Sequence, residues 1–245
     1  PRSTPKPSSA ASDVYKRQPD NSTRELPEGS SGYDLAKDIG PGLAKSAVAV
    51  IVDGEQKDLH DVIEGDSLVS IITIDSDNGL EIMRHTLTAQ VLASALKNIY
   101  PNARLAIGPT IDDGFYYDVE SEVSISIDDL QKIENEMKKI ISTKSNITKK
   151  LSNKKDSLKV FKNLDEPYKE AIINESDQEE NFQLYYQDND IFVDLCKGPH
   201  LPNLGFIGAF KLTRVSGAYW KGDSKNLSLI HISEPTRQEA ISYAV

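Results

Sequence analysis

The chain of 245 residues is poor in sulfur and in aromatic side chains. It has one cysteine, two methionines and one tryptophan, and aromatic residues make up 7% of it. A single cysteine excludes an intrachain disulfide and is typical of a reducing cytoplasm. No apolar run approaches the roughly 20 residues that a membrane-spanning helix needs, and no signal peptide is visible. We therefore expect a soluble, cytoplasmic protein without a membrane partner.

Positive charge is also scarce. The chain has 28 lysine and arginine residues against 38 aspartate and glutamate residues, a formal net charge of −10 at pH 7. Because lysine and arginine dominate the binding of phosphates, this balance argues against tight binding of nucleic acid by the chain as a whole. The basic tract Lys144–Lys159 is a local exception. It is interpreted either as a solvated face or as a contact with an RNA backbone.

Both ends of the chain contain unusual sequence. There is no initiator methionine, and the peptides Asp13–Gln18 and Leu227–Ile232 can be encoded by complementary DNA, which two unrelated hexapeptides rarely allow. Their flanks resemble translated sequencing adapters. We expect residues 1–18 and 227–245 to be disordered, adapter-derived tails outside the fold, so that His231 is no candidate ligand. The other interpretation is a natural disordered tail at each end.

The pattern between these tails predicts two domains. In residues 19–76, Val48–Val52 is a β-branched run that ends at an Asp-Gly turn, and Leu68–Ile74 is a second apolar strand. A helix is expected in Tyr33–Lys45, interrupted by glycine and proline. The polar segment Asp75–Gly79 marks the domain boundary.

In residues 77–226 the pattern predicts helices and a hairpin. Leu80–Tyr100 carries an apolar stripe at helical spacing. Leu105–Ile111 and Phe115–Val119 flank an Asp-Asp-Gly sequence and are predicted to form a β-hairpin. Asp128–Ile141 is the clearest amphipathic helix.

Residues suited to chemistry gather in three short segments. Asp194–His200 holds the only cysteine and one of the four histidines, four positions apart. Gly108–Asp118 and Gly217–Asp223 concentrate aromatic, glycine and aspartate residues. A Cys/His pair at this spacing, taken alone, is compatible with half of a metal site, with a nucleophile and its base, or with two residues that only pack in the core.

These segments make the chain resemble the amino-terminal half of bacterial threonyl-tRNA synthetases. Residues 38–45, Asp-Ile-Gly-Pro-Gly-Leu-Ala-Lys, are typical of the TGS domain. The rest resembles the following editing domain in four ordered blocks: Gly79–His85, Gly108–Asp118, Val193–His200 and Gly217–Asp223. The resemblance implies an α+β chain, with a β-grasp TGS domain at residues 19–76 and a two-layer α+β editing domain at 77–226.

The resemblance also implies the function. The family ligates threonine to tRNA, but the core that uses ATP, Mg and Zn, and through which the family forms homodimers, would lie outside this chain. Within the chain it implies only hydrolysis of the seryl ester at the acceptor end of tRNA(Thr), without a cofactor. Serine lacks one methyl group of threonine, and a difference of that size gives only about 1–3 kcal/mol of discrimination, so a second hydrolytic pocket is needed. The alternatives are a free-standing trans-editing deacylase and a non-catalytic module that binds the tRNA acceptor end.

Residue-by-residue correspondence with the family predicts the site. The residues expected to be catalytic are His85, Lys169, Cys196 and His200, and those expected to bind substrate are Gln90, Tyr117 and Asp194. Lys169 would stabilise an oxyanion or orient water, Asp194 would bind the substrate amino group, and Tyr117 would bind substrate or the terminal adenosine. Purely structural interpretations stay open: a surface lysine, an aspartate that caps a turn, and one core residue in the pair Tyr116-Tyr117.

The chain departs from the family pattern on the long helix. The family has two histidines at i and i+4, whereas here the run from His85 to Gln90 is one residue longer and ends in glutamine. Five residues of α-helix would leave the two side chains about 140° apart. Either a bulge absorbs the extra residue or His85 points away from the pocket. His85, Cys196 and His200 with a water could form a zinc set as in alanyl-type domains, but the threonyl resemblance implies none, and no metal ligand is predicted. Trp220 is interpreted as a packing residue.

Overall fold

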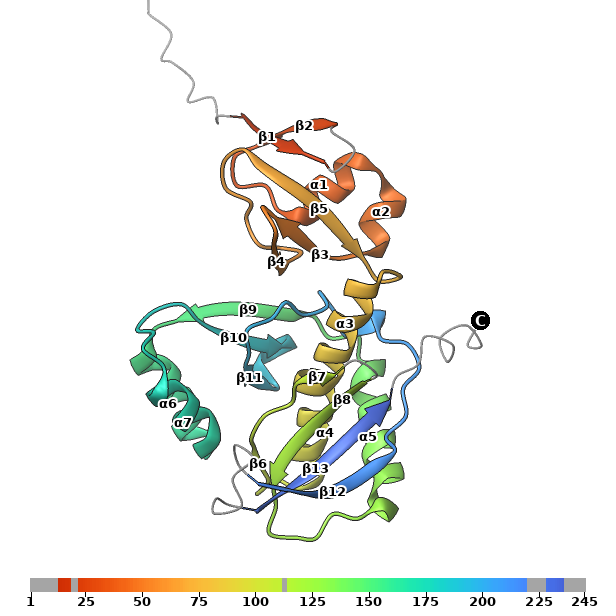
Figure 1. The fold of residues 1–245 in the computed structure, drawn as a ribbon, viewed down its shortest axis with the longest axis vertical. Coiled ribbons are helices and arrows are strands. Elements are labelled where there is room, and N and C mark those ends of the chain that lie inside the picture. The colour runs from red at the N-terminus through yellow and green to blue at the C-terminus, as the bar shows by residue number, and fades with distance from the viewer. Residues whose placement is uncertain (1–12, 19–21, 112–113, 220–227, 236–245) are drawn as a thin grey trace, which may run out of the picture. The chain divides into compact units, whose positions relative to one another are not determined.

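The computed structural model describes residues 13–18, 22–111, 114–219 and 228–235 (Figure 1). The chain divides between Ser76 and Asp77 into two compact units, each of which is considered by itself. Within the described ranges, no helix combines the length and the apolar character that crossing a membrane requires.

The first unit is a five-stranded sheet with two short helices. Its elements are β1 (Asp13–Arg17), β2 (Thr23–Pro27), α1 (Gly32–Ile39), α2 (Pro41–Ser46), β3 (Ala47–Val52), β4 (Glu55–Asp58) and β5 (Ser67–Thr73). The strand order is β2-β1-β5-β3-β4, in which β1 and β5 are parallel and the other pairs are antiparallel. This mixed sheet confirms the predicted β-grasp fold.

Local sequence explains this unit. Asp53 and Gly54 both have positive φ, as the predicted turn between β3 and β4 requires. Ser31 and Asp34 form a reciprocal capping box that starts α1. Apolar residues of α1 and the strands then form a buried core, which includes Leu35, Val50 and Val69.

The prediction that residues 1–18 lie outside the fold is wrong for β1. This strand fills the gap between β2 and β5, whose facing backbone groups would otherwise lack partners. The Lys16 side chain is buried, and its amine donates to the carbonyl oxygens of Ile63 and Gly65. Residues 1–12 lie outside the described ranges, and the adapter origin of the segment stays a prediction.

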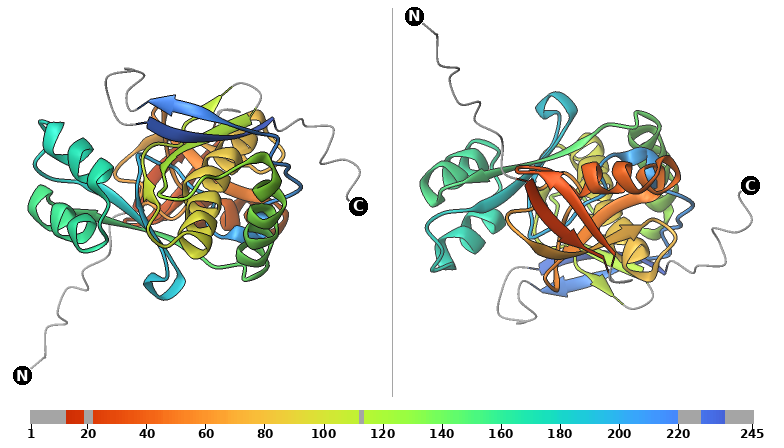
Figure 2. Two further views of the ribbon diagram at one scale, coloured as in Figure 1. Left: turned by 90° about the horizontal axis from the view of Figure 1, so that it is seen from below. Right: turned by 90° about the horizontal axis from the view of Figure 1, so that it is seen from above.

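The second unit contains two sheets and the long helical segments (Figure 2). Its elements are α3 (Asp77–Thr86), η1 (Leu87–Leu92), α4 (Ala93–Ile99), β6 (Arg104–Leu105), β7 (Thr110–Ile111), β8 (Gly114–Glu120), η2 (Ile127–Asp129), α5 (Leu130–Ser142), β9 (Ile147–Ser152), α6 (Lys154–Asn163), α7 (Pro167–Glu175), β10 (Phe182–Gln187), η3 (Asp188–Asp190), β11 (Val193–Leu195), η4 (Leu204–Phe206), β12 (Arg214–Tyr219) and β13 (Ser228–Pro235). One sheet has the order β12-β13-β8-β6, with β7 also paired to β8. The other has the order β11-β10-β9.

The helices are arranged against these sheets by their apolar faces. The segments α4 and α5 pack together, and η1 packs against β8, so that helices cover one side of the larger sheet. The pair α6 and α7 packs through Phe161 and Ile173 against Phe182 and Leu184 of β10. The architecture is the predicted α+β fold. The predicted hairpin of Leu105–Ile111 with Phe115–Val119 forms through β7 and β8, while its Asp112-Asp113 turn lies outside the described residues.

The prediction that residues 227–245 lie outside the fold is wrong for β13. It is an inner strand that pairs with β12 on one side and with β8 on the other. Leu229 and Ile232 are buried, which follows from the apolar residues in this stretch. His231 accordingly has a structural position, with Nδ1 2.8 Å from the Asp118 carboxylate and its ring against Tyr116.

Candidate functional site

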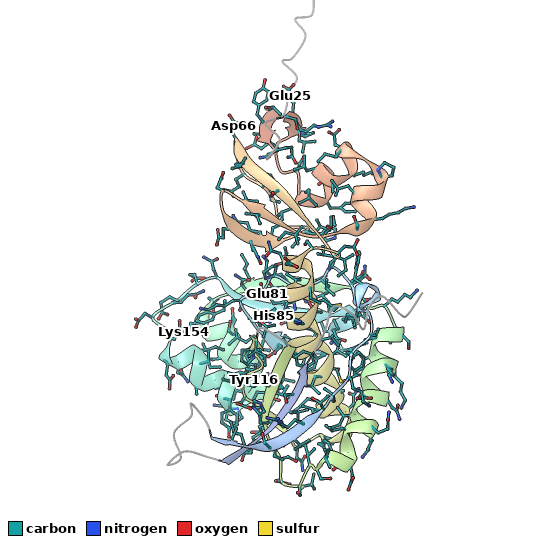
Figure 3. All side chains as sticks on the ribbon, turned by 45° about the vertical axis from the view of Figure 1, so that its right-hand side comes forward. Glu25, Asp66, Glu81, His85, Tyr116 and Lys154 are labelled. Carbon is teal, nitrogen blue, oxygen red and sulfur yellow. The ribbon has the colours of Figure 1, made fainter. Side chains whose placement is uncertain are left out.

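The long helix contains a π-helical turn immediately after His85. The helix predicted over residues 80–100 forms as α3, η1 and α4, and η1 (Leu87–Leu92) is a π-helix. Because π-helical hydrogen bonds join residues five apart, such a turn accommodates one extra residue. The predicted bulge is therefore the correct alternative, and His85 is not rotated away. Figure 3 labels His85 on α3.

Three side chains from distant parts of the sequence meet beside this helix. His85 Nε2 lies 2.7 Å from Cys196 Sγ, and the rings of His85 and His200 are stacked with centroids 4.6 Å apart. The Cys/His half of the site comes from the segment that follows β11. Gly198, in that segment, has a φ of +66°, and a Cβ there would collide with the Tyr185 hydroxyl. The absence of a side chain at position 198 thus lets the segment lie against β10.

Thr86 fixes the ring of His200. Its hydroxyl is 2.9 Å from the Ile82 carbonyl oxygen, 3.1 Å from His200 Nδ1 and 3.0 Å from the amide nitrogen of Leu201. A hydroxyl has one proton, so donation to Ile82 requires it to accept from both other groups. His200 then carries its proton on Nδ1, and Nε2 is the basic nitrogen of the ring.

A second cluster is formed by Lys169, Asp194 and Tyr117. Lys169 Nζ lies 2.8 Å from Asp194 Oδ1, and the two side chains are only 5% and 3% exposed. The same amine donates to the Tyr117 hydroxyl over 3.3 Å, and that hydroxyl also hydrogen-bonds to the Asp194 side chain. Lys169 is therefore not a surface lysine. Tyr117, not Tyr116, is the fully buried member of the tyrosine pair.

The two clusters are adjacent because of strand alternation. Asp194 in β11 and Cys196 just after it are two positions apart, a spacing that puts both side chains on one side of a strand. Charges on Asp194 and Lys169 accordingly influence the thiol of Cys196. The structure thus brings together six of the seven predicted site residues: His85, Tyr117, Lys169, Asp194, Cys196 and His200.

Burial controls the protonation states in the site. It raises the pKa of Cys196 to about 12, so the thiol is protonated at neutral pH and is not a thiolate nucleophile. Burial also lowers the pKa of His200 well below its usual value, and His85 lowers it further, so His200 is neutral. The pKa of Asp194 is raised by burial, although Lys169 opposes this shift. The site therefore places the neutral imidazole of His200 near the Lys169–Asp194 ion pair.

Gln90 takes a different position from the other predicted residues. It is fully buried, and Gln187 Nε2 donates to its backbone oxygen over 2.9 Å and lies 3.4 Å from its side-chain oxygen. The Gln90 Nε2 group has no hydrogen-bond partner among the described residues. The Gln90 carbonyl oxygen also accepts from the backbone amide of Ala93, so Gln187 adds a second bond, and in this structure Gln90 contributes to the contact of η1 with β10.

Several contributors were not identified from the sequence. Thr86 orients His200, and the ring of Tyr185 packs edge-on against His200 at 4.4 Å. Thr86 directly follows the family-like block Gly79–His85, and nothing in the sequence singled out Tyr185. Trp220 lies outside the described residues.

The three ligand atoms of His85, Cys196 and His200 could hold a metal ion. They lie within 4.8 Å of one another, and two imidazoles with one thiolate are a ligand type of catalytic zinc sites. A metal would have to displace the proton of Cys196, against the raised pKa of the thiol. The residues therefore fit a three-ligand metal site in composition and spacing.

Comparisons with known proteins agree with the fold. A family model of the TGS domain matches residues 14–73, and a model described as the threonyl and alanyl tRNA synthetase second additional domain matches residues 183–233. Both matches include residues assigned above to tails. The chain is 44% identical over 214 residues to a threonine–tRNA ligase of Acidithiobacillus ferrooxidans and 45% identical to one of Hahella chejuensis.

These alignments cover 87% of the chain but only 33% of each relative, so the chain spans about a third of the length of the curated relatives that it matches. The aligned part of the relatives does not include their aminoacylation core. Through its TGS and second additional domain matches, the chain is therefore similar to the amino-terminal region of bacterial threonine–tRNA ligases.

Proposed function

We propose that the second unit hydrolyses the ester of seryl-tRNA(Thr), as a proofreading activity in the cytoplasm. The observation that carries this proposal is the meeting of His85, Cys196 and His200 with the buried Lys169–Asp194 pair. Ester hydrolysis needs a base for the attacking water and a positive group for the charge that develops on the carbonyl oxygen. The two clusters supply one of each.

The reaction assigns separate roles to the residues. Water attacks the ester carbonyl carbon while His85, the more exposed of the two imidazoles, accepts a proton from it. The ammonium group of Lys169 stabilises the oxyanion. The carbon–oxygen bond to the ribose then breaks, and the ribose oxygen takes up the proton from His85. Asp194 holds Lys169 in place and is the acceptor for the substrate amino group.

No metal ion takes part in this proposal, and the thiol of Cys196 acts as a neutral wall of the pocket. A neutral sulfur beside His85 restricts the space for a substrate side chain, as a pocket that accepts serine and rejects the extra methyl group of threonine requires. Aminoacylation itself is assigned to the part of the relatives outside the alignment, together with ATP, Mg and Zn.

The assay measures deacylation of seryl-tRNA(Thr) and threonyl-tRNA(Thr) by the full chain, with and without a chelator. The proposal predicts selective, chelator-insensitive loss of the seryl ester, which His85→Ala reduces by about 100-fold or more. A chelator-sensitive reaction would assign a metal to the trio of His85, Cys196 and His200.

A non-catalytic module that binds the tRNA acceptor end is the second candidate. It is favoured by Gln90, which is placed as a packing residue and cannot act as a base. Binding of tRNA without deacylation by the folded chain would select this candidate. A free-standing trans-editing deacylase shares the chemistry of the first proposal and differs only in lacking an attached aminoacylation core.

A further inference from the structure

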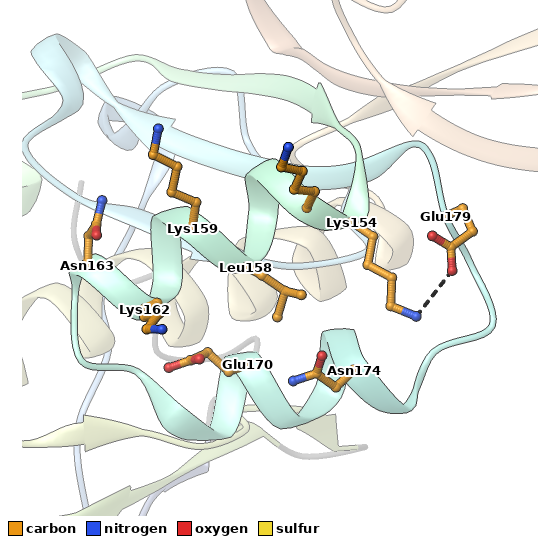
Figure 4. Close-up of a pocket in the computed structure, with 9 residues that line it drawn as sticks. Lys154, Leu158, Lys159, Lys162, Asn163, Glu170, Asn174 and Glu179 are labelled. Carbon is orange, nitrogen blue, oxygen red and sulfur yellow. Dashed lines mark hydrogen bonds and ion pairs between the residues drawn. The ribbon is translucent and has the colours of Figure 1, made fainter.

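The helical hairpin of α6 and α7 carries a groove that the proposed reaction does not use (Figure 4). Its volume is about 560 Å³, and it is open to solvent. Four lysines line it, Lys154, Lys155, Lys159 and Lys162, in a chain whose net charge is −10. The groove is therefore a local concentration of positive charge on an acidic protein.

Three of these lysines form one stripe. Lys155, Lys159 and Lys162 are spaced four and three residues apart, so they lie on one face of α6 over about 10 Å of helix. All three are exposed. Lys154 differs, because its amine is 3.3 Å from a carboxylate oxygen of Glu179 and donates to the Ser176 carbonyl oxygen.

The remaining lining suits a phosphodiester backbone. With Glu179 paired to Lys154, Glu170 is the other acid that lines the groove. Asn163 and Asn174 contribute amide groups, which can donate to phosphate oxygens and bond to 2′-hydroxyls. Base-specific readout would need a groove that reaches base edges, whereas spaced lysines and amides bind the backbone of A-form RNA by its shape and charge.

The groove is linked to the proposed site through α7. Lys169, which pairs with Asp194, and Glu170, which lines the groove, are adjacent residues of this helix. An RNA held along α6 would thus be bound on the same hairpin that carries the ammonium group for the reaction.

We infer that the stripe Lys155, Lys159 and Lys162 binds the phosphate backbone of the RNA whose ester the site hydrolyses. This inference rests on the proposed function for the identity of the RNA. Its energetic signature is release of counterions, so affinity falls steeply with salt.

The test measures binding of a labelled RNA hairpin, a tRNA acceptor stem ending in CCA, by fluorescence anisotropy at several salt concentrations. In the full chain, the combined variant Lys155→Ala, Lys159→Ala and Lys162→Ala should raise Kd about tenfold or more and reduce the slope of log K against log salt by about 2 to 3. Glu170→Gln should lower Kd, because it removes a like charge from the path of the phosphates.

A matched control changes the same net charge on α5, by Lys132→Ala, Lys138→Ala and Lys139→Ala, and should alter Kd less than threefold. Equal effects of the two triple variants, or none, would overturn the inference, as would preference for anionic vesicles over RNA. Far-UV circular dichroism verifies that each variant is folded.

A second measurement separates this inference from the proposed function. The minimal ester 3′-seryl-adenosine has no stem to occupy the groove, so the α6 variant should hydrolyse it as fast as the unaltered chain. Loss of RNA binding by the α6 variant in a chain that never hydrolyses the minimal ester would refute the proposed function and leave the groove assignment intact.

Discussion

Replacement of Lys169 by methionine tests the central pair of the site. Lys169 and Asp194 are 5% and 3% exposed and 2.8 Å apart, so Lys169→Met removes the cation and leaves a carboxylate in a desolvated position. Removal of one partner of a buried ion pair costs about 3–5 kcal/mol, because the remaining charge is uncompensated. Against the usual 5–15 kcal/mol of total stability, this loss is easily measured.

The loss of stability caused by Lys169→Met should depend on pH, and the pKa of Asp194 determines the direction. Burial raises the pKa of Asp194 and Lys169 opposes the rise, so the pKa must be higher still in the variant. A carboxyl group whose pKa is raised on folding binds a proton in the native state. The resulting stabilisation is fully present below the unfolded pKa of about 3.9 and is lost as pH rises through the folded pKa. The variant should therefore lose more stability, relative to the unaltered chain, at pH 8 than at pH 4.

Urea unfolding followed by circular dichroism at these two pH values measures the effect, and amide hydrogen exchange assigns it to the second unit. The double variant Lys169→Met, Asp194→Asn serves as the matched control. It contains no buried charge at this pair, so it should recover about half or more of the lost stability. A single variant that costs less than about 1 kcal/mol, or whose cost does not change with pH, would refute the buried-pair argument.

Three further predictions concern the surroundings of the pair. Thr86→Val should cost about 1–3 kcal/mol in urea unfolding, because the Leu201 amide and His200 Nδ1 lose their partner, whereas Thr86→Ser should cost less. Gly108→Ala should cost about 1–3 kcal/mol by thermal unfolding, and should slow ester hydrolysis, because a Cβ there would collide with the Tyr117 ring. Alkylation of Cys196 by iodoacetamide should accelerate about tenfold per pH unit from pH 7 to 10, since its thiol pKa is about 12; a plateau below pH 9 would contradict this.

Local sequence rules predicted the parts of the fold that depend on neighbouring residues. The Asp-Gly turn after β3 has the positive φ values that its residue types favour. The amphipathic stretch at residues 128–141 became α5, because its apolar spacing is set within the helix itself. The Cys196–His200 spacing indicated that these two residues lie close together, but it did not reveal that His85 lies opposite them, since that depends on how α3 packs against the segment after β11.

Contacts between residues distant in the sequence determine the features that the sequence did not predict. Whether Lys169 is a surface residue or a buried ion-pair partner depends on Asp194, which lies 25 residues further along the chain and comes from β11. The two terminal segments were predicted to be disordered because their possible coding DNA resembles adapters. Such a resemblance carries no information about β pairing. Strands β1 and β13 form because the neighbouring strands of each sheet present backbone groups that would otherwise lack partners.

The π-helical turn explains how His85 keeps its position beside Cys196 despite the extra residue between His85 and Gln90. In a regular α-helix the extra residue would shift every side chain on one side of it by about 100°, so either His85 or the core residues of α4 would leave their positions. With the extra residue absorbed between Leu87 and Leu92, His85 contacts Cys196 while Ala95 and Leu96 remain buried. The Gln90 carbonyl oxygen in the turn accepts from the Ala93 amide and also from Gln187 Nε2, which ties the turn to β10. The extra residue therefore leaves His85 in contact with Cys196, while Gln90, predicted to bind substrate, is buried and in contact with Gln187.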